Sequence, residues 1–174
     1  MKNLPVIYLK PGELHISSEP SLVTTVLGSC VSVTMFNRRL GIGAICHGML
    51  PECSSSDSRR CLSSGICKDS CRDCLKYVDC SIYSMIGQFQ KLGIGSNEIE
   101  VKLFGGANVL QVRNGADSNT VGNQNIKKAM QVINSEKLKL TASDVGGERG
   151  YKIIFYPHTG EVMRKRIKKG IWGN

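Results

Sequence analysis

Residues 31–46 read Val-Ser-Val-Thr-Met-Phe-Asn-Arg-Arg-Leu-Gly-Ile-Gly-Ala-Ile-Cys, with a cysteine directly before them and a histidine directly after. Apolar and small polar side chains alternate over 31–36, Asn-Arg-Arg interrupts the alternation, and it resumes over 40–46. The stretch therefore predicts an antiparallel hairpin. With a two-residue loop of Arg38 and Arg39, Cys30 lies directly opposite His47, whereas a register slip of one residue would separate them.

This register predicts a catalytic pair. Directly opposed residues have Cβ atoms about 4.5–5.5 Å apart, close enough for a thiol and an imidazole to share a proton. A histidine partner can lower a thiol pKa from about 8.5 to roughly 3.5–7.5, which makes the nucleophilic thiolate. Cys30 would attack a carbonyl, His47 would hold the proton, and backbone N–H groups after Gly28 would receive the oxyanion. A single cysteine is also often a small buried hydrophobe, so the spacing alone leaves both interpretations open.

Four blocks of the sequence resemble the chemoreceptor glutamine deamidase family, CheD, in the order that the family has them. They are Thr-Thr-Val-Leu-Gly-Ser-Cys-Val-Ser-Val at 24–33, His-Gly-Met-Leu-Pro at 47–51, Val-Lys-Leu-Phe-Gly-Gly-Ala at 101–107 and Asp-Val-Gly-Gly-Glu-Arg-Gly at 144–150. Segments 10–14 and 121–125 are also similar to family segments. The resemblance implies a cysteine-dependent amidohydrolase that converts glutamine side chains of methyl-accepting chemotaxis receptors to glutamate and releases ammonia.

The resemblance also implies the site residues. The family's nucleophile falls on Cys30, its general base on His47 and its third active-site residue on Thr24. A threonine hydroxyl can orient the imidazole or donate to a reacting oxygen, and the sequence does not separate these roles. Thr25 is the alternative, because adjacent residues of a strand point to opposite faces and only one of the two is expected to reach the site.

The expected fold is a single α+β domain over residues 1–174, with mixed β-sheets sandwiched between helices in α/β/β/α-like layers. This is what the resemblance implies, and the alternation of strands and helices permits it. A chain of this length is typical of one domain with a sizeable core. The patterns predict helices over 77–92 and 121–136 (Asn123 as a cap), a strand over 99–104 and a closing hairpin of 151–156 and 161–167.

Neither a signal-peptide core nor eighteen consecutive apolar residues occurs in the sequence. We therefore expect a cytoplasmic protein without membrane insertion, whose cysteines stay reduced. The paired glycines at 105–106 and 146–147 fit neither a dinucleotide-binding nor a P-loop pattern, so we expect no cofactor.

A cysteine-rich loop insertion at about 52–76 departs from the family pattern. Cysteines occur at 53, 61, 67, 71, 74 and 80, but only Cys71 and Cys74 have the spacing of a zinc knuckle. We expect no metal there; the weak candidate ligands are Cys61, Cys67, Cys71 and Cys74. The alternatives are a mobile loop of reduced thiols over the site, or redox control in which loop thiols pair with one another or with Cys30. Cys46 points away from His47 and is expected to be a buried core thiol.

Four other polar residues compete for roles in the site. His15 is the fallback base if the hairpin register is wrong, whereas His158 lies in a turn where exposure is expected. Glu148 and Arg149 interrupt a glycine-rich turn, where they either line the substrate groove or serve as ordinary turn residues.

The chain is basic, with 23 Lys and Arg against 14 Asp and Glu and a net charge of +9. The positive charge suits the Glu-rich helices that the resemblance implies as substrate, the cytoplasmic helices of chemotaxis receptors. Two alternatives stay open: a catalytically idle regulator that binds a CheC-type phosphatase, a partner that the resemblance also implies, or a nucleic-acid-binding protein. No RNA-recognition, KH or zinc-finger pattern supports the last, so we expect no nucleic-acid partner.

Overall fold

The computed structural model describes residues 4–53, 73–109 and 119–167, and over these ranges the strands form two mixed sheets. The four-stranded sheet has the order β1 (Val6–Tyr8), β3 (Leu22–Leu27), β8 (Tyr151–Tyr156) and β9 (Glu161–Arg166). The five-stranded sheet has the order β2 (Leu14–Ser17), β5 (Ile42–Cys46), β4 (Val31–Asn37), β6 (Glu100–Gly105) and β7 (Lys139–Val145). The helices are α2 (Val78–Lys91), α3 (Val121–Ser135) and the short 3-10 helices η1 (Cys74–Lys76) and η2 (Ser96–Glu98).

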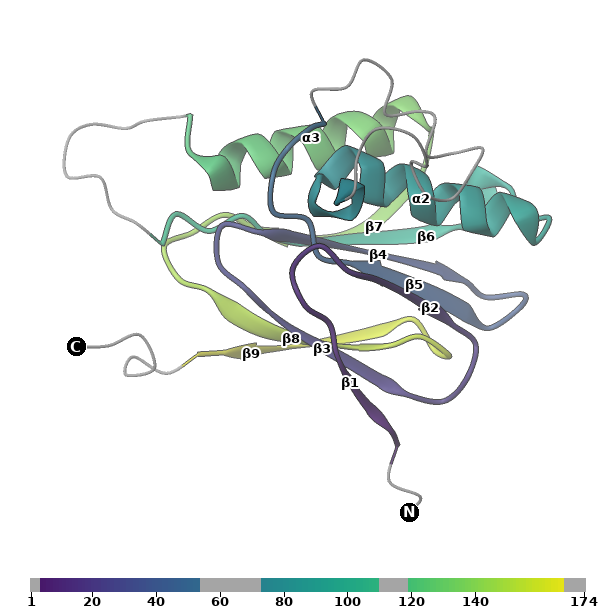
Figure 1. Cartoon of the computed structure of the whole chain (residues 1–174). Helices are drawn as coiled ribbons and strands as arrows, with labels where there is room; N and C mark the ends of the chain where they lie inside the picture. Colours follow the sequence, from purple (N-terminus) through teal and green to yellow (C-terminus); the bar gives the residue numbers. More distant parts are fainter. Residues whose placement is uncertain (1–3, 54–72, 110–118, 168–174) are drawn as a thin grey trace.

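The elements stack in three layers (Figure 1). Both α-helices lie on one face of the five-stranded sheet, and the four-stranded sheet lies against its other face. The predicted α+β class and the single domain are confirmed. The layering differs from the expected α/β/β/α arrangement, because the described residues place no helix on the outer face of the four-stranded sheet.

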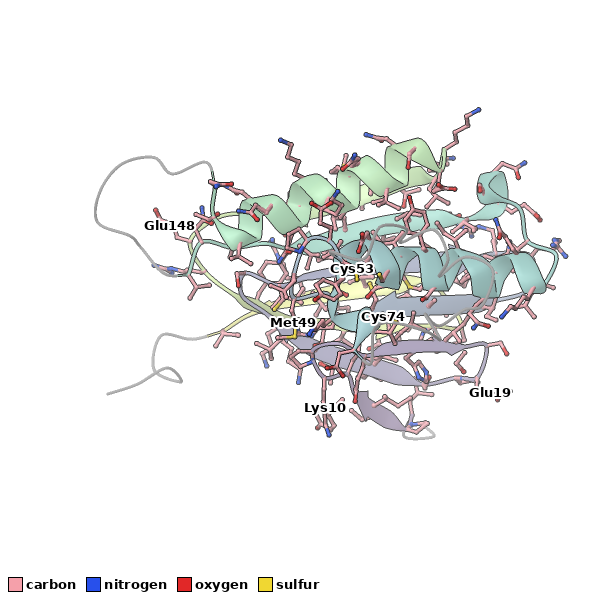
Figure 2. The ribbon with its side chains drawn as sticks, turned by 45° about the horizontal axis from the view of Figure 1, so that its top comes forward. Lys10, Glu19, Met49, Cys53, Cys74 and Glu148 are labelled. Carbon is pink, nitrogen blue, oxygen red and sulfur yellow. The ribbon has the colours of Figure 1, made fainter. Side chains whose placement is uncertain are left out.

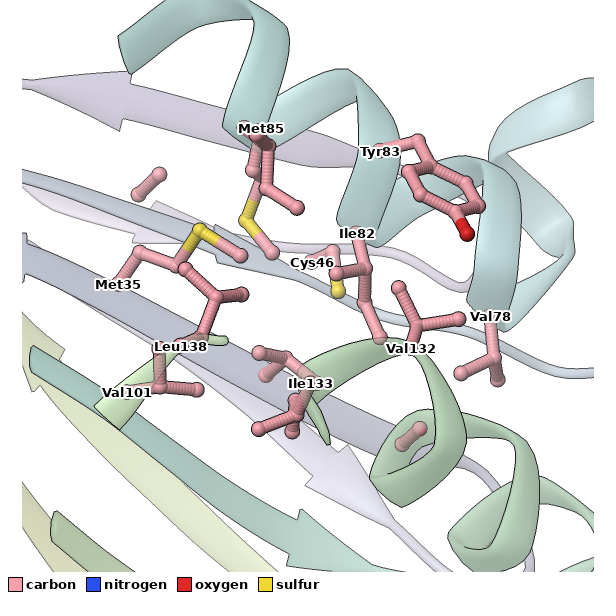
Figure 3. Packing of buried hydrophobic residues seen from close by; sticks show 14 of the residues in the cluster. Met35, Cys46, Val78, Ile82, Tyr83, Met85, Val101, Val132, Ile133 and Leu138 are labelled. Atoms are coloured by element: carbon pink, nitrogen blue, oxygen red, sulfur yellow. The ribbon is translucent and has the colours of Figure 1, made fainter. Parts of the chain in front are cut away.

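The five-stranded sheet separates two apolar cores. The larger core lies between this sheet and the helices, and the smaller one lies between the two sheets. The predicted stripe of α2 is buried at Val78, Ile82, Met85 and Phe89, whereas Leu92 is exposed because it caps the helix instead of belonging to it. Cys46 faces α2 in the larger core (Figure 3), as predicted. Burial raises the pKa of its thiol to about 12.

The predicted hairpin is present, but its predicted register is wrong. Thr34 pairs with Ile45 and Asn37 with Ile42, so the loop has four residues, 38–41, instead of two. Continued along the strands, this register sets position 47 across from position 32, and an isolated bridge pairs Val31 with Gly48. The shift is two residues, and a shift of two keeps every side chain on its predicted face. Cys30 and His47 therefore keep a common side without being directly opposed.

The remaining predicted elements lie within a residue or two of their expected bounds, namely both helices, the strand β6 and the closing hairpin of β8 and β9. The cap of α3 differs from the prediction, since Thr120 accepts the N–H of Asn123. Most of the expected insertion at about 52–76 lies outside the described residues.

Candidate active site

Residues 28–30 link β3 to β4 and carry the candidate nucleophile Cys30, so this segment is called the nucleophile loop. It is held in place through its carbonyl groups. All three carbonyl oxygens accept hydrogen bonds: Gly28 from the N–H of Ala107 at 2.8 Å, Ser29 from Asn125 Nδ2 at 3.0 Å and Cys30 from the N–H of Gly106 at 2.8 Å. The donors belong to the segment after β6 and to α3. The other side of the loop is left facing the cavity described below.

The glycine pair after β6 makes this approach possible. Gly105 has a φ of 102°, and a Cβ atom there would overlap the carbonyl of Cys30. Only glycine combines this backbone conformation with so close an approach. This glycine turn thus brings backbone against the nucleophile loop itself.

His47 follows β5 and is 2% exposed. Its Nδ1 lies 2.7 Å from Thr25 Oγ1, which lies 2.8 Å from the carbonyl oxygen of Leu9. A carbonyl only accepts, so the single hydroxyl proton of Thr25 goes to Leu9 and its oxygen must accept from Nδ1–H. The neutral ring therefore carries its proton on Nδ1. Nε2 keeps its lone pair and has no hydrogen-bond partner among the described residues.

Cys30 and His47 line the same cavity, which has a volume of about 620 Å³. Thr24 and Thr25 line it as well, and Tyr8, Lys10 and Lys152 contribute to its walls. No hydrogen bond joins Cys30 Sγ to His47 within the described part of the chain. A substrate group that enters the cavity can thus reach both the thiol and the imidazole.

Burial keeps both groups neutral near pH 7. It lowers the pKa of His47 to about 4, against a smaller opposing effect from the nearby carboxylate of Glu13. It also raises the pKa of the Cys30 thiol, which the N–H of Cys30 itself only partly offsets. The expected lowering of the thiol pKa is therefore wrong: burial raises this pKa, and among the described residues the imidazole makes no hydrogen bond to the sulfur. A neutral thiol at this position could act as a nucleophile only if its proton left Sγ during the attack, and Nε2 has the lone pair to accept that proton.

The structure brings both threonine candidates to the cavity, which differs from the expectation that only one would reach the site. Thr24 Oγ1 donates to the carbonyl oxygen of Ile153 at 3.0 Å, whereas Thr25 holds the imidazole. The contact with His47 thus falls on the alternative residue.

The other polar candidates lie elsewhere. His15, on β2, pairs with Ile45 of β5, and His158 packs edge-on against Tyr156. Neither histidine lines the cavity of Cys30. Contrary to expectation, His158 is partly buried. Glu148 and Arg149 line a second cavity of about 310 Å³, and Glu148 lies well apart from Lys10 (Figure 2).

The candidate metal ligands Cys61, Cys67 and Cys71 lie outside the described residues. Cys74 is buried at the start of η1, in the core beneath α2. Within the described ranges, no group of three or more His, Cys, Asp or Glu side chains is placed to hold a metal ion. In the same ranges, no helix has the length and apolar character needed to cross a membrane.

Sequence reasoning missed two groups that hold the site, the carbonyl of Leu9 and the side chain of Asn125, and the carboxylate of Glu13, which acts on the pKa of His47. In the sequence, segment 121–125 stands out only by its resemblance to a family segment. The contacts of Asn125 join positions 76 and 96 residues apart, so no local pattern signals them.

The comparisons with known proteins agree with one another. The family model described as CheD chemotactic sensory transduction matches residues 62–166. The probable chemoreceptor glutamine deamidase CheD 2 of Geobacter sulfurreducens is 45% identical over 166 residues, which cover 95% of this chain and 92% of the relative. Proteins named probable chemoreceptor glutamine deamidase CheD are 36% identical in Maridesulfovibrio salexigens, over 94% of this chain and 92% of the relative, and 39% identical in Oleidesulfovibrio alaskensis, over 94% and 74%.

Proposed function

The chain belongs to the CheD family, and we propose that it deamidates glutamine side chains of chemotaxis receptors with Cys30 as the nucleophile. The observation that carries this assignment is that a thiol and an imidazole, whose Nε2 has no partner in the described part of the chain, line one cavity. Chemoreceptor glutamine deamidase is also what its relatives are named.

The reaction proceeds in two halves. Cys30 Sγ attacks the carbonyl carbon of the glutamine amide while its proton passes to His47 Nε2, and the carbonyl oxygen becomes an oxyanion. The C–N bond then breaks, Nε2 returns the proton to nitrogen, and ammonia leaves a thioester. Water attacks the thioester carbon and gives a proton to Nε2. The C–S bond breaks, the proton returns to sulfur, and the product is a glutamate side chain.

The two threonines have different roles in this mechanism. Thr25 accepts from Nδ1–H and so presents the basic nitrogen to the thiol. Thr24 remains a proposed active-site residue. Its hydroxyl proton is given to Ile153, which leaves the oxygen able to accept from the amide N–H of the substrate but not to donate to a reacting oxygen.

The proposed substrate is a receptor helix in the cytoplasm, where we expect this protein to act. Lys10 and Lys152 stand at the cavity and suit an acidic partner. A CheC-type phosphatase is a further proposed partner. The alternative of an idle regulator would keep that binding and lack turnover.

The test is to incubate the purified protein with cytoplasmic fragments of a receptor and to follow conversion of glutamine to glutamate by mass spectrometry. Cys30→Ala should abolish conversion while the fold is kept. Cys46→Ala is the matched control, because it removes a thiol from the helix-side core and should leave conversion intact. Conversion that persists in Cys30→Ala would refute the nucleophile, and none with the unaltered protein would favour the idle regulator.

A further inference from the structure

Asn125 is a buried polar residue in an apolar layer. It lies in the second turn of α3 and is 0% exposed. Its Nδ2 donates two hydrogen bonds of 3.0 Å, to the carbonyl oxygens of Ser29 and Met49. Both partners only accept, so the amide nitrogen must face them. The side chain therefore ties the nucleophile loop to the segment that follows His47.

The first of these bonds sets the direction of an N–H group. The C=O of Ser29 and the N–H of Cys30 belong to one planar trans peptide, in which they point in opposite directions. Since Asn125 draws the oxygen toward α3, the N–H of Cys30 points away from α3. That N–H lies beside the sulfur of its own residue, and within the described ranges it donates to no backbone carbonyl.

The second bond, to the carbonyl oxygen of Met49, ties Asn125 to a segment that backbone hydrogen bonds hold in place. Met49 (Figure 2) follows Gly48, which exchanges backbone hydrogen bonds of 2.9 and 3.0 Å with Val31. The segment that carries His47 and the segment that carries Cys30 are thus joined through backbone hydrogen bonds and also through Asn125.

Asn125 does not complete its own hydrogen bonding. Its Oδ1 is buried and has no partner among the described residues. A buried unpaired oxygen opposes folding, and such groups are few in folded proteins. Despite this unfavourable effect on folding, Asn125 supplies two N–H donors, and both bond to the segments that carry Cys30 and His47.

From this geometry we propose that Asn125 is a positioning residue that aims the N–H of Cys30 at the oxyanion formed during deamidation. The proposal rests on the proposed function, because the oxyanion is an intermediate of that reaction. The N–H is the contacting group, and Asn125 acts through the peptide that it holds. Without it, the Ser29 carbonyl loses the hydrogen bond that fixes its direction, and the N–H of Cys30 can turn away from the cavity.

The test uses Asn125→Leu, which keeps a similar size and removes both donors without adding charge. Loss of one oxyanion donor costs about 10²–10³ in kcat, and we expect kcat on receptor fragments to fall by at least tenfold with KM within about twofold. Alkylation of Cys30 by iodoacetamide, followed on its peptide by mass spectrometry, should stay within about twofold, because this substitution forms no oxyanion. Ile133→Ala is the control, since it destabilises the same helix in its buried core; its kcat should stay unchanged.

Two further outcomes decide the proposal. A parallel fall of kcat and alkylation, or an unchanged kcat, would overturn it in favour of a merely structural role. The amide NMR signal of Cys30 tests the positioning without turnover: it should move in Asn125→Leu and not in Ile133→Ala, and an unmoved signal overturns the proposal. If the unaltered protein converts no receptor glutamine, the proposed function fails by itself, and the NMR comparison still judges the peptide orientation.

Discussion

At the scale of single residues, the site pairs two groups that burial keeps neutral. The pKa of the Cys30 thiol is raised and that of His47 is lowered, both by desolvation. A neutral imidazole is the form that accepts a proton, so the lowered pKa favours general-base action over a preformed ion pair. In the proposed mechanism the thiol is therefore a weaker nucleophile at rest and ionises only as it attacks.

The pH dependence of turnover follows from the pKa of His47. Because the base must be neutral, we expect kcat/KM to stay level from pH 7 to about 5 and to fall as the pH drops through about 4. The measurement is kcat/KM for a receptor fragment across this range, with the fold checked at each pH. Half-maximal activity near the ordinary histidine value of about 6.5 would contradict the effect of burial.

Stability should depend on pH for the same reason. Burial lowers the pKa of folded His47 to about 4, so the unfolded chain binds the extra proton first and stability is lost as the pH falls from about 6.5 to 4. We expect His47 to lower the free energy of unfolding by about 2 kcal/mol between pH 7 and 5. Urea unfolding of the protein and of His47→Gln measures it; equal losses in both would rule out His47 as the source.

The two threonines allow a paired test. Thr25→Val removes the acceptor for Nδ1–H and frees the ring to take the other tautomer, so we expect kcat to fall by about tenfold or more. Thr24→Val is the matched variant: it removes a hydroxyl bonded to Ile153 and leaves the ring contact in place. A larger loss of kcat in Thr24→Val would give the third role to Thr24, as the family resemblance has it.

At the scale of elements, the start of α3 packs unusually close to the segment after β6. A Cβ atom on Gly122 would lie 2.5 Å from the carbonyl oxygen of Gly106, so the two backbones are nearly in contact. This contact fixes the position of α3 relative to β6, and in that position Asn125 reaches the nucleophile loop.

Gly122→Ala tests this packing, since Ala normally stabilises a helix over Gly by about 1 kcal/mol. Here we expect the opposite sign, a loss of about 1–3 kcal/mol in the free energy of unfolding, because the added methyl group overlaps backbone. Turnover should fall too, since α3 must shift. Gln131→Ala, exposed on the same helix, should change stability by no more than about 0.5 kcal/mol. A stabilised Gly122→Ala would show that the helix shifts freely.

At the scale of the whole molecule, the net charge of +9 predicts attraction to an acidic receptor. We expect kcat/KM for receptor fragments to fall about tenfold as salt rises from low to high concentration, because screening removes long-range steering. Alkylation of Cys30 by neutral iodoacetamide is the control and should not change. Salt-independent turnover would exclude steering.

Patterns between near neighbours in the chain predicted much of this molecule. The stripe of α2 and the alternation of β4 and β6 follow from periods of 3.6 and 2, so their bounds were close to those observed. The order of the motifs was enough for the family and for Cys30 and His47 as candidates. These features depend on residues a few positions apart, and the chain records such relations directly.

The arrangement around the thiol required the packed molecule. The four-residue loop left Cys30 off the position opposite His47, and burial, which has no local signature, reversed the expected shift of the thiol pKa. Thr25 meets the imidazole because β3 of one sheet lies against the end of β5 of the other, and Asn125 reaches the nucleophile loop because α3 packs over it. Each contact joins segments distant in the chain, so its geometry exists only once the two sheets and the helices have come together.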